Sequence, residues 1–271
     1  MPQTTYLLTY LLTYLLTYLL TYLLTYLLRT VREIIVVDRS AIQRSDRGAI
    51  SDNVAVNYRT VLTNLPTYQP MRPDFVYFDL GNVLLYFDHS IAIRKMAKVA
   101  GISTEQIRSI VFDGTLQIEY ESGQISGGQF VSRISDSIGR DLDVREMLQA
   151  AADMFIPNAH ILPVLEKIRG LGIPMGLLSN TCEAHWSWIS ELAYPQVQGW
   201  FAPVILSYEV KSMKPDAHIY REAQRHSGHE APGIFFTDDR AENVAAAHNA
   251  GWMAEVFVNA DRLMKTVESW K

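Results

Sequence analysis

The residues best suited to chemistry each follow a short apolar segment of the chain. They are Asp79 after 75–78, Ser179 and Asn180 after 173–178, Lys214 beyond 204–206, and Asp238 with Asp239 after 234–237. A carboxylate can act as a nucleophile or as a ligand for a hard cation. Hydroxyl, amide and ammonium groups can hold an anion that gains charge during a reaction. This set of side chains therefore predicts chemistry on an anionic substrate.

The apolar segments must position these groups if they are to act together. Phe75–Phe78 is rich in β-branched and aromatic residues and reads as a strand buried on both faces. The later segments alternate with helical patterns, which indicates an α/β fold with a doubly wound, parallel, Rossmann-like sheet. Since ligands of such sheets bind beyond the carboxyl ends of the strands, the polar groups are expected to converge at one edge.

Each residue also has a structural interpretation. Asp79 stands in an Asp-x-Gly triplet typical of turns, and Ser179 and Asn180 could cap the next helix. Lys214 could be a solvated surface lysine, with Lys211 taking its place in the site. The Asp238 and Asp239 pair could likewise cap a helix that begins near residue 241. Polar residues follow four strands in this order, which favours one shared site over four unrelated turns or helix caps.

The segments Asp79-Leu80-Gly81-Asn82-Val83, Ser179-Asn180, Lys214-Pro215 and Asp238-Asp239 resemble, in this order, the four motifs of the haloacid dehalogenase-like hydrolase superfamily. The resemblance covers residues 71–271. It implies that Asp79 is a nucleophile that forms an aspartyl-phosphate.

The same resemblance implies a Mg²⁺ site and a phosphoryl-binding site. Magnesium would be held by Asp79, the backbone carbonyl of Gly81 and Asp239, with Asp238 as an outer partner. Ser179 and Asn180 would donate to the phosphoryl oxygens, and Lys214 would balance the negative charge of the site.

Gly81 departs from the usual pattern, in which a second aspartate two residues after the nucleophile acts as general acid and base. The pattern Asp-Leu-Gly-Asn-Val resembles a branch that contains glucose 1-phosphate phosphatases, so activity is still expected. The general acid is then unassigned, and Asp88 and His89 are the candidates to inspect first.

A helical segment separates the first strand from the others. Residues 91–100, 104–111, 128–138 and 144–154 carry helical apolar spacing. We expect an all-helical cap at 88–157, inserted in a catalytic core formed by 71–87 and 158–271. Residues 119–126 resemble a turn in the caps of sugar-phosphate phosphatases, although an ordinary helix connection would have the same pattern.

The N-terminal part of the chain is of low complexity. Residues 5–28 repeat Thr-Tyr-Leu-Leu, and the first charged residue is Arg29. Residues 4–28 are long enough for a membrane anchor, but no basic segment stands ahead of the repeat and no signal-cleavage pattern follows it. We expect residues 1–70 to be an extension outside the fold, with Met71 as a candidate initiator.

The composition of the chain limits the kinds of molecule that it is expected to bind. The net charge of −5 provides no basic surface for nucleic acid, and the seven histidines show no zinc-ligand spacing. The single cysteine, Cys182, excludes an intramolecular disulfide and reads as a buried side chain. We expect a cytoplasmic protein that acts on a small phosphorylated metabolite.

Three functions fit these observations. The favoured one is a magnesium-dependent phosphatase of a small metabolite, for example a sugar phosphate. A 2-haloacid dehalogenase would use Asp79 on carbon, but it has no need of the Asp238 and Asp239 pair for a metal. The third is a non-catalytic protein that binds a phosphorylated metabolite and lost its activity when it lost the general acid.

Overall fold

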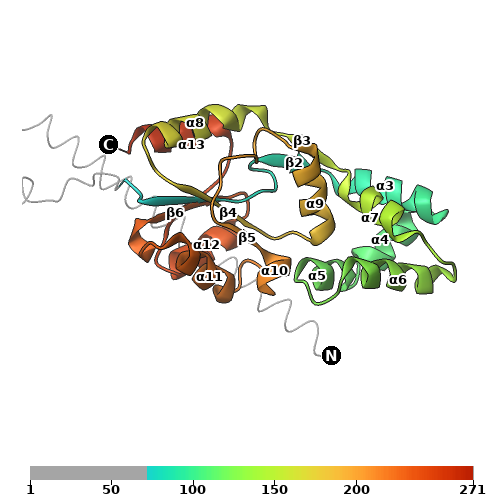
Figure 1. The fold of residues 1–271 in the computed structure, drawn as a ribbon. Coiled ribbons are helices and arrows are strands. Elements are labelled where there is room, and N and C mark those ends of the chain that lie inside the picture. The colour runs from blue at the N-terminus through green and yellow to red at the C-terminus, as the bar shows by residue number, and fades with distance from the viewer. Residues whose placement is uncertain (1–71, 271) are drawn as a thin grey trace, which may run out of the picture. The chain divides into compact units, whose positions relative to one another are not determined.

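The computed structural model describes residues 72–270 (Figure 1). The predicted extension at 1–70, the candidate anchor at 4–28 and the candidate initiator Met71 lie outside these residues. Within 72–270 no helix is both long and apolar enough to cross a membrane.

A five-stranded parallel sheet forms the centre of the fold. Its order is β5-β4-β1-β6-β7, made of β5 Val204–Leu206, β4 Met175–Ser179, β1 Phe75–Phe78, β6 Ile234–Asp238 and β7 Met253–Val256. The chain builds outward from β1 to one edge and then returns to build the other. The order therefore reverses between β1 and β6, where doubly wound sheets bind their ligands.

Strand β1 is buried on both faces because its side chains alternate between two apolar clusters. Val76 and Phe78 belong to one cluster, while Phe75 and Tyr77 belong to the other. Helices α8 Leu162–Gly170 and α13 Ala260–Glu268 cover the first face, and α11 Ala217–Ser227 and α12 Ala241–Asn249 cover the second (Figure 1). The predicted α/β fold with a doubly wound parallel sheet is confirmed.

A helical insertion, defined here as α3–α7, follows the first strand and has an apolar cluster of its own. Its helices are α3 His89–Ala100, α4 Thr104–Val111, α5 Leu116–Glu121, α6 Gly127–Ile138 and α7 Val144–Ala152. Serine caps that accept from the third residue begin α4 and α6, and left-handed glycines end α3 and α6. Four of the five helices carry the predicted apolar spacing.

The short helix α5 was not predicted. Its last three residues, 119–121, belong to the segment that was interpreted as a turn, and the turn itself occupies 122–126. The other elements are helix α9 Glu183–Leu192, the short helix α10 Ser207–Val210, and the 3₁₀ turns at Ala159–Ile161 and Ala231–Gly233. Strand β7 also begins at Met253 instead of the expected Glu255.

Two short antiparallel strands join the helical insertion to the sheet region. Strands β2 Leu85–Phe87 and β3 Phe155–Pro157 pair with Phe87 opposite Phe155. The predicted boundaries at 87/88 and 157/158 assign these paired strands to different domains. The division into 71–87 with 158–271 and 88–157 stays a prediction.

Candidate functional site

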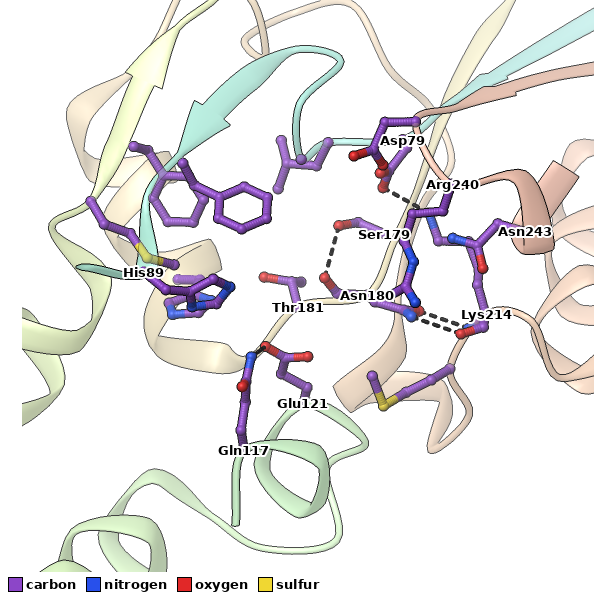
Figure 2. A pocket seen from close by; sticks show the side chains of 18 residues that line it. Asp79, His89, Gln117, Glu121, Ser179, Asn180, Thr181, Lys214, Arg240 and Asn243 are labelled. Atoms are coloured by element: carbon purple, nitrogen blue, oxygen red, sulfur yellow. Dashed lines mark hydrogen bonds and ion pairs between the residues drawn. The ribbon is translucent and has the colours of Figure 1, made fainter. Parts of the chain in front are cut away.

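The predicted site residues converge at the carboxyl edge of the sheet. Asp79 leaves β1, Ser179 ends β4 and Asp239 directly follows β6, so the exits of three neighbouring strands bring these side chains to one cavity. The cavity measures about 180 Å³, and Lys214, Asn180, Asp239 and Gly81 also line it (Figure 2).

Lys214 lies between two carboxylates. Its Nζ is 2.7 Å from Asp79 Oδ1 and 2.6 Å from Asp238 Oδ2, and it also donates to the Leu178 carbonyl at 2.9 Å. All three charged residues are buried, with Asp238 fully inaccessible. Since an isolated buried charge is strongly disfavoured, this arrangement makes each of the three depend on the others.

The charges of this cluster shift one another's pKa. Burial raises the pKa of Asp79 to about 7, against the lowering effect of the Lys214 ammonium. Burial alone would lower the pKa of Lys214, but the Asp79 and Asp238 carboxylates outweigh it and raise that pKa. Lys214 is therefore a fixed cation beside the candidate nucleophile.

Three carboxylates lie close enough to share a metal ion. Asp79, Asp238 and Asp239 each offer an oxygen, and these oxygens lie within 4.8 Å of one another. Oxygen ligands of this kind suit Mg²⁺. The donor set therefore fits the predicted ion.

The two aspartates after β6 have different surroundings. Both Asp238 oxygens accept hydrogen bonds, from Lys214 Nζ, from the Arg240 backbone N–H at 2.8 Å and from Asn243 Nδ2 at 3.0 Å. Asp239 is less buried, and its Oδ2 accepts from Asn82 Nδ2 at 2.8 Å. Asp239 is thus the better placed of the two to bind an ion directly, as the resemblance implied.

Asn180 was expected to donate to a phosphoryl group, but in the structure it bonds to the backbone of Lys214. Its Nδ2 donates to the Lys214 carbonyl at 2.8 Å, and its Oδ1 accepts from the Lys214 N–H at 2.7 Å. One of its two amide hydrogens is therefore committed to holding the Lys214 loop. The role of Asn180 in phosphoryl binding stays a prediction, as does that of the buried Ser179 hydroxyl.

The structure places the two candidates for the general acid in different surroundings. Asp88 is the N-cap of α3, where its Oδ1 accepts from the Ser90 N–H at 2.8 Å, and it does not line the cavity. Hydrogen bonds from Ser90 lower the pKa of Asp88, which makes it a poor proton donor. His89 does line the cavity, and burial lowers its pKa.

Sequence reasoning missed several residues that line the cavity. Gln117 and Glu121 come from α5, and Thr181 follows β4 (Figure 2). His185 lies in the first turn of α9. Burial lowers the pKa of His185 to about 4, so this imidazole is neutral at physiological pH. Only Glu121 gave a signal in the sequence, because it stands in the segment that resembles a cap turn.

Comparisons with known proteins point to one family. A model described as "Haloacid dehalogenase-like hydrolase" matches residues 129–256. D-ribitol-5-phosphate phosphatase of Bacteroides thetaiotaomicron is 27% identical over 185 residues, covering 65% of this chain and 88% of that relative. (S)-2-haloacid dehalogenase of Pseudomonas fluorescens is 29% identical over 119 residues, covering 42% of this chain and 51% of that enzyme.

A solved structure shares the fold. It is a had family enzyme of Bacteroides thetaiotaomicron in complex with magnesium and inorganic phosphate, with 26% identity and a TM-score of 0.60. The alignment covers 67% of this chain and 92% of that one.

Proposed function

The chain belongs to the haloacid dehalogenase-like hydrolases, and from this premise we propose that it is a magnesium-dependent phosphatase of a small phosphorylated metabolite. The observation that carries the proposal is the cluster of Asp79, Asp238 and Asp239 around Lys214. The relative that acts on ribitol 5-phosphate and the solved structure with magnesium and phosphate support this choice.

Asp79 would attack phosphorus through a carboxylate oxygen. The bond from phosphorus to the alcohol oxygen breaks, the alkoxide takes a proton from solvent water and leaves as the alcohol, and the phosphoryl group stays on Asp79 as an aspartyl-phosphate. Water then attacks phosphorus, the bond from phosphorus to the Asp79 oxygen breaks, and a proton returns to solvent, which releases phosphate and restores the Asp79 carboxylate.

Asp79, the Gly81 carbonyl and Asp239 would hold Mg²⁺, which supplies positive charge that lets an anionic carboxylate approach an anionic phosphate. Lys214 adds a second positive charge at the nucleophile, and Ser179 offers a hydroxyl to the phosphoryl oxygens. Asp238 would act by holding Lys214, since its oxygens already accept several hydrogen bonds.

The helical insertion would act as the cap over this site. Gln117, Glu121 and His89 belong to it and line the cavity together with residues of the sheet edge. A metabolite bound there is enclosed between the two, which excludes bulk water from the reacting phosphate.

Release of inorganic phosphate from a panel of phosphate esters, with Mg²⁺ and with the metal chelated, tests the proposal. We expect hydrolysis that requires the metal. Release of halide from 2-chloropropionate without metal would instead identify a dehalogenase. Binding of phosphate esters with no turnover of any would identify a binding protein.

A further inference from the structure

The cavity has a second polar region, on the wall that faces the phosphoryl-binding groups. It consists of Glu121 with Gln117 from α5 and Thr181 from the loop after β4 (Figure 2). None of these side chains has a role in the attack on phosphorus described above.

Glu121 is held in place at the cavity wall. Gln117 Nε2 donates to its Oε1 at 2.7 Å, so one carboxyl oxygen is fixed and the other remains for a ligand. Burial raises the pKa of Glu121 to about 7, against the lowering effects of Gln117 and Arg240. Near neutral pH the carboxyl can therefore accept a hydrogen bond from an alcohol or donate one to it.

Thr181 presents a polar atom that has no partner among the described residues. Its side chain is 2% exposed, and its Oγ1 makes no hydrogen bond within 72–270. Buried hydroxyls are normally satisfied, so this oxygen in a ligand cavity indicates a partner supplied by the ligand.

A single buried hydroxyl sets the spacing between the two residues. Ser207 Oγ lies 2.6 Å from the Glu121 carbonyl and accepts from the Thr181 N–H at 2.9 Å. Lys211 Nζ donates to the Gly123 carbonyl at 2.6 Å, which adds a second link between the helical insertion and α10. Glu121 and Thr181 are thus held together although one belongs to the helical insertion and the other follows a strand of the sheet.

The same wall borders a second, smaller cavity. This neighbouring cavity of about 30 Å³ shares Glu121 and Gln117, but its other walls are largely apolar, including Met96, Val111 and Phe130. It has room for about one water-sized group. Glu121 and Gln117 are thus the polar groups that separate the site cavity from a largely apolar one.

We propose that Glu121 and Thr181 bind hydroxyl groups of the leaving alcohol, which makes the substrate a phosphate ester of a compact, uncharged polyol or sugar. The inference rests on the proposed phosphatase function and specifies its substrate class. Ser207 and Gln117 are positioning residues for this pair. A second anionic group on the substrate would meet the Glu121 carboxyl and would be disfavoured, because Arg240, a cation that also lines the cavity, is already paired with Glu242.

Steady-state kinetics with Mg²⁺ on three esters, with phosphoglycolate as a fourth, anionic ester, tests the proposal. Ribitol phosphate has hydroxyls along its chain, pentyl phosphate has the same carbon count without them, and nitrophenyl phosphate has a leaving group that departs without a proton. We expect wild-type kcat/KM to be higher for ribitol phosphate than for pentyl phosphate, and higher than for the anionic ester phosphoglycolate.

Glu121→Ala should lower kcat/KM for ribitol phosphate about ten- to hundredfold, the loss of one hydrogen bond that involves a charged group. Thr181→Val should lower it about three- to tenfold. Both variants should leave pentyl and nitrophenyl phosphate unchanged within about twofold. The matched control is Glu119→Gln, on the same helix, because Glu119 pairs with Arg133 and does not line the cavity.

Several outcomes would overturn the inference. Equal losses on ribitol and pentyl phosphate with nitrophenyl phosphate unchanged would make Glu121 a proton donor. Equal losses on all three esters, with or without a lowered melting temperature, would make its role structural. A wild-type preference for phosphoglycolate or indifference to hydroxyls would also contradict it. If wild type hydrolyses none of the esters, the proposed phosphatase function itself fails.

Discussion

At the scale of single residues, the buried ion cluster holds three charged side chains together, and under the proposed function it would serve catalysis as well as stability. Lys214 neutralises two carboxylates, Asp79 and Asp238, that have little contact with water. A cation so placed lowers the repulsion between Asp79 and an incoming phosphate, and its removal leaves two buried anions uncompensated.

Asp79→Asn should abolish ester hydrolysis and leave the fold intact. The substitution keeps the side-chain shape but removes the nucleophile and one expected metal ligand. Phosphate release and a thermal melt, measured side by side, check both parts. Metal-dependent turnover by the variant at a rate near that of wild type would show that Asp79 is only structural.

Lys214→Met should destabilise the protein by about 3–5 kcal/mol, the usual cost of removing one partner of a buried ion pair. Adding Asp238→Asn should restore part of the loss, because it removes one of the stranded charges. Lys167→Met is the control, since Lys167 is an exposed lysine of α8. Urea unfolding of the wild type, the two single variants Lys214→Met and Asp238→Asn, the double variant and the control measures the differences, and additive effects of the two single changes would argue against the coupling.

The raised pKa of Glu121 predicts a stability difference that depends on pH. The unfolded chain releases this proton near pH 4.3 and the folded chain near pH 7, so the stability that the group contributes is full below about pH 4 and is lost as the pH rises to about 7. Glu121→Gln should therefore raise the melting temperature, relative to wild type, more at pH 8 than at pH 4.

Glu119→Gln is expected to change the melting temperature in the opposite direction. Hydrogen bonds from Thr115 and Arg133 lower the pKa of Glu119, so its stabilising contribution is present above its unfolded pKa and is lost as the pH falls. This variant should lower the melting temperature at pH 8 and have less effect at pH 4. Parallel pH profiles for the two variants would contradict the assignment.

At the scale of the elements, the loop from β1 to β2 explains why Gly81 carries no acid. A Cβ at Gly81 would lie 2.7 Å from Phe87 Cε1, and the backbone of Gly81 does not require a positive φ. Close approach of the Phe87 ring, from the strand pair β2–β3, is therefore what demands glycine. An aspartate fits there only if this ring moves.

Gly81→Asp alone should lower the melting temperature and give no selective gain in rate. Combined with Phe87→Ala, it should speed hydrolysis of pentyl phosphate relative to nitrophenyl phosphate, because only the alkoxide needs a proton as it leaves. Phe87→Ala alone is the control. A selective gain in the single Gly81→Asp variant would show that the ring yields without cost.

The elements differ in how far the sequence could predict them. The strands that deliver Asp79, Ser179 and Asp238 are continuous apolar runs, and their order alone predicts that the exits converge. Helix α5 has six residues, too few for a clear periodicity, and β2 and β3 are three residues each. Glu121 and Thr181 therefore escaped prediction, because their place in the cavity depends on tertiary contacts through Ser207.

At the scale of the whole molecule, the described residues 72–270 belong to one compact unit, and all their paired strands lie within it. We expect a chain that begins at Met71 to fold and to keep its hydrolase activity. Size-exclusion chromatography, a thermal melt and phosphate release would measure this. Aggregation of the shorter chain while the full chain stays well behaved would contradict it.

The central claim, that Asp79 carries the phosphoryl group during turnover, is tested most directly by acid quenching the enzyme with substrate and Mg²⁺ and analysing its peptides by mass spectrometry. The account predicts a phosphoryl adduct on the peptide that contains Asp79, present only with metal and missing from Asp79→Asn. Steady turnover with no adduct on that peptide, or with the adduct on another residue, would contradict it.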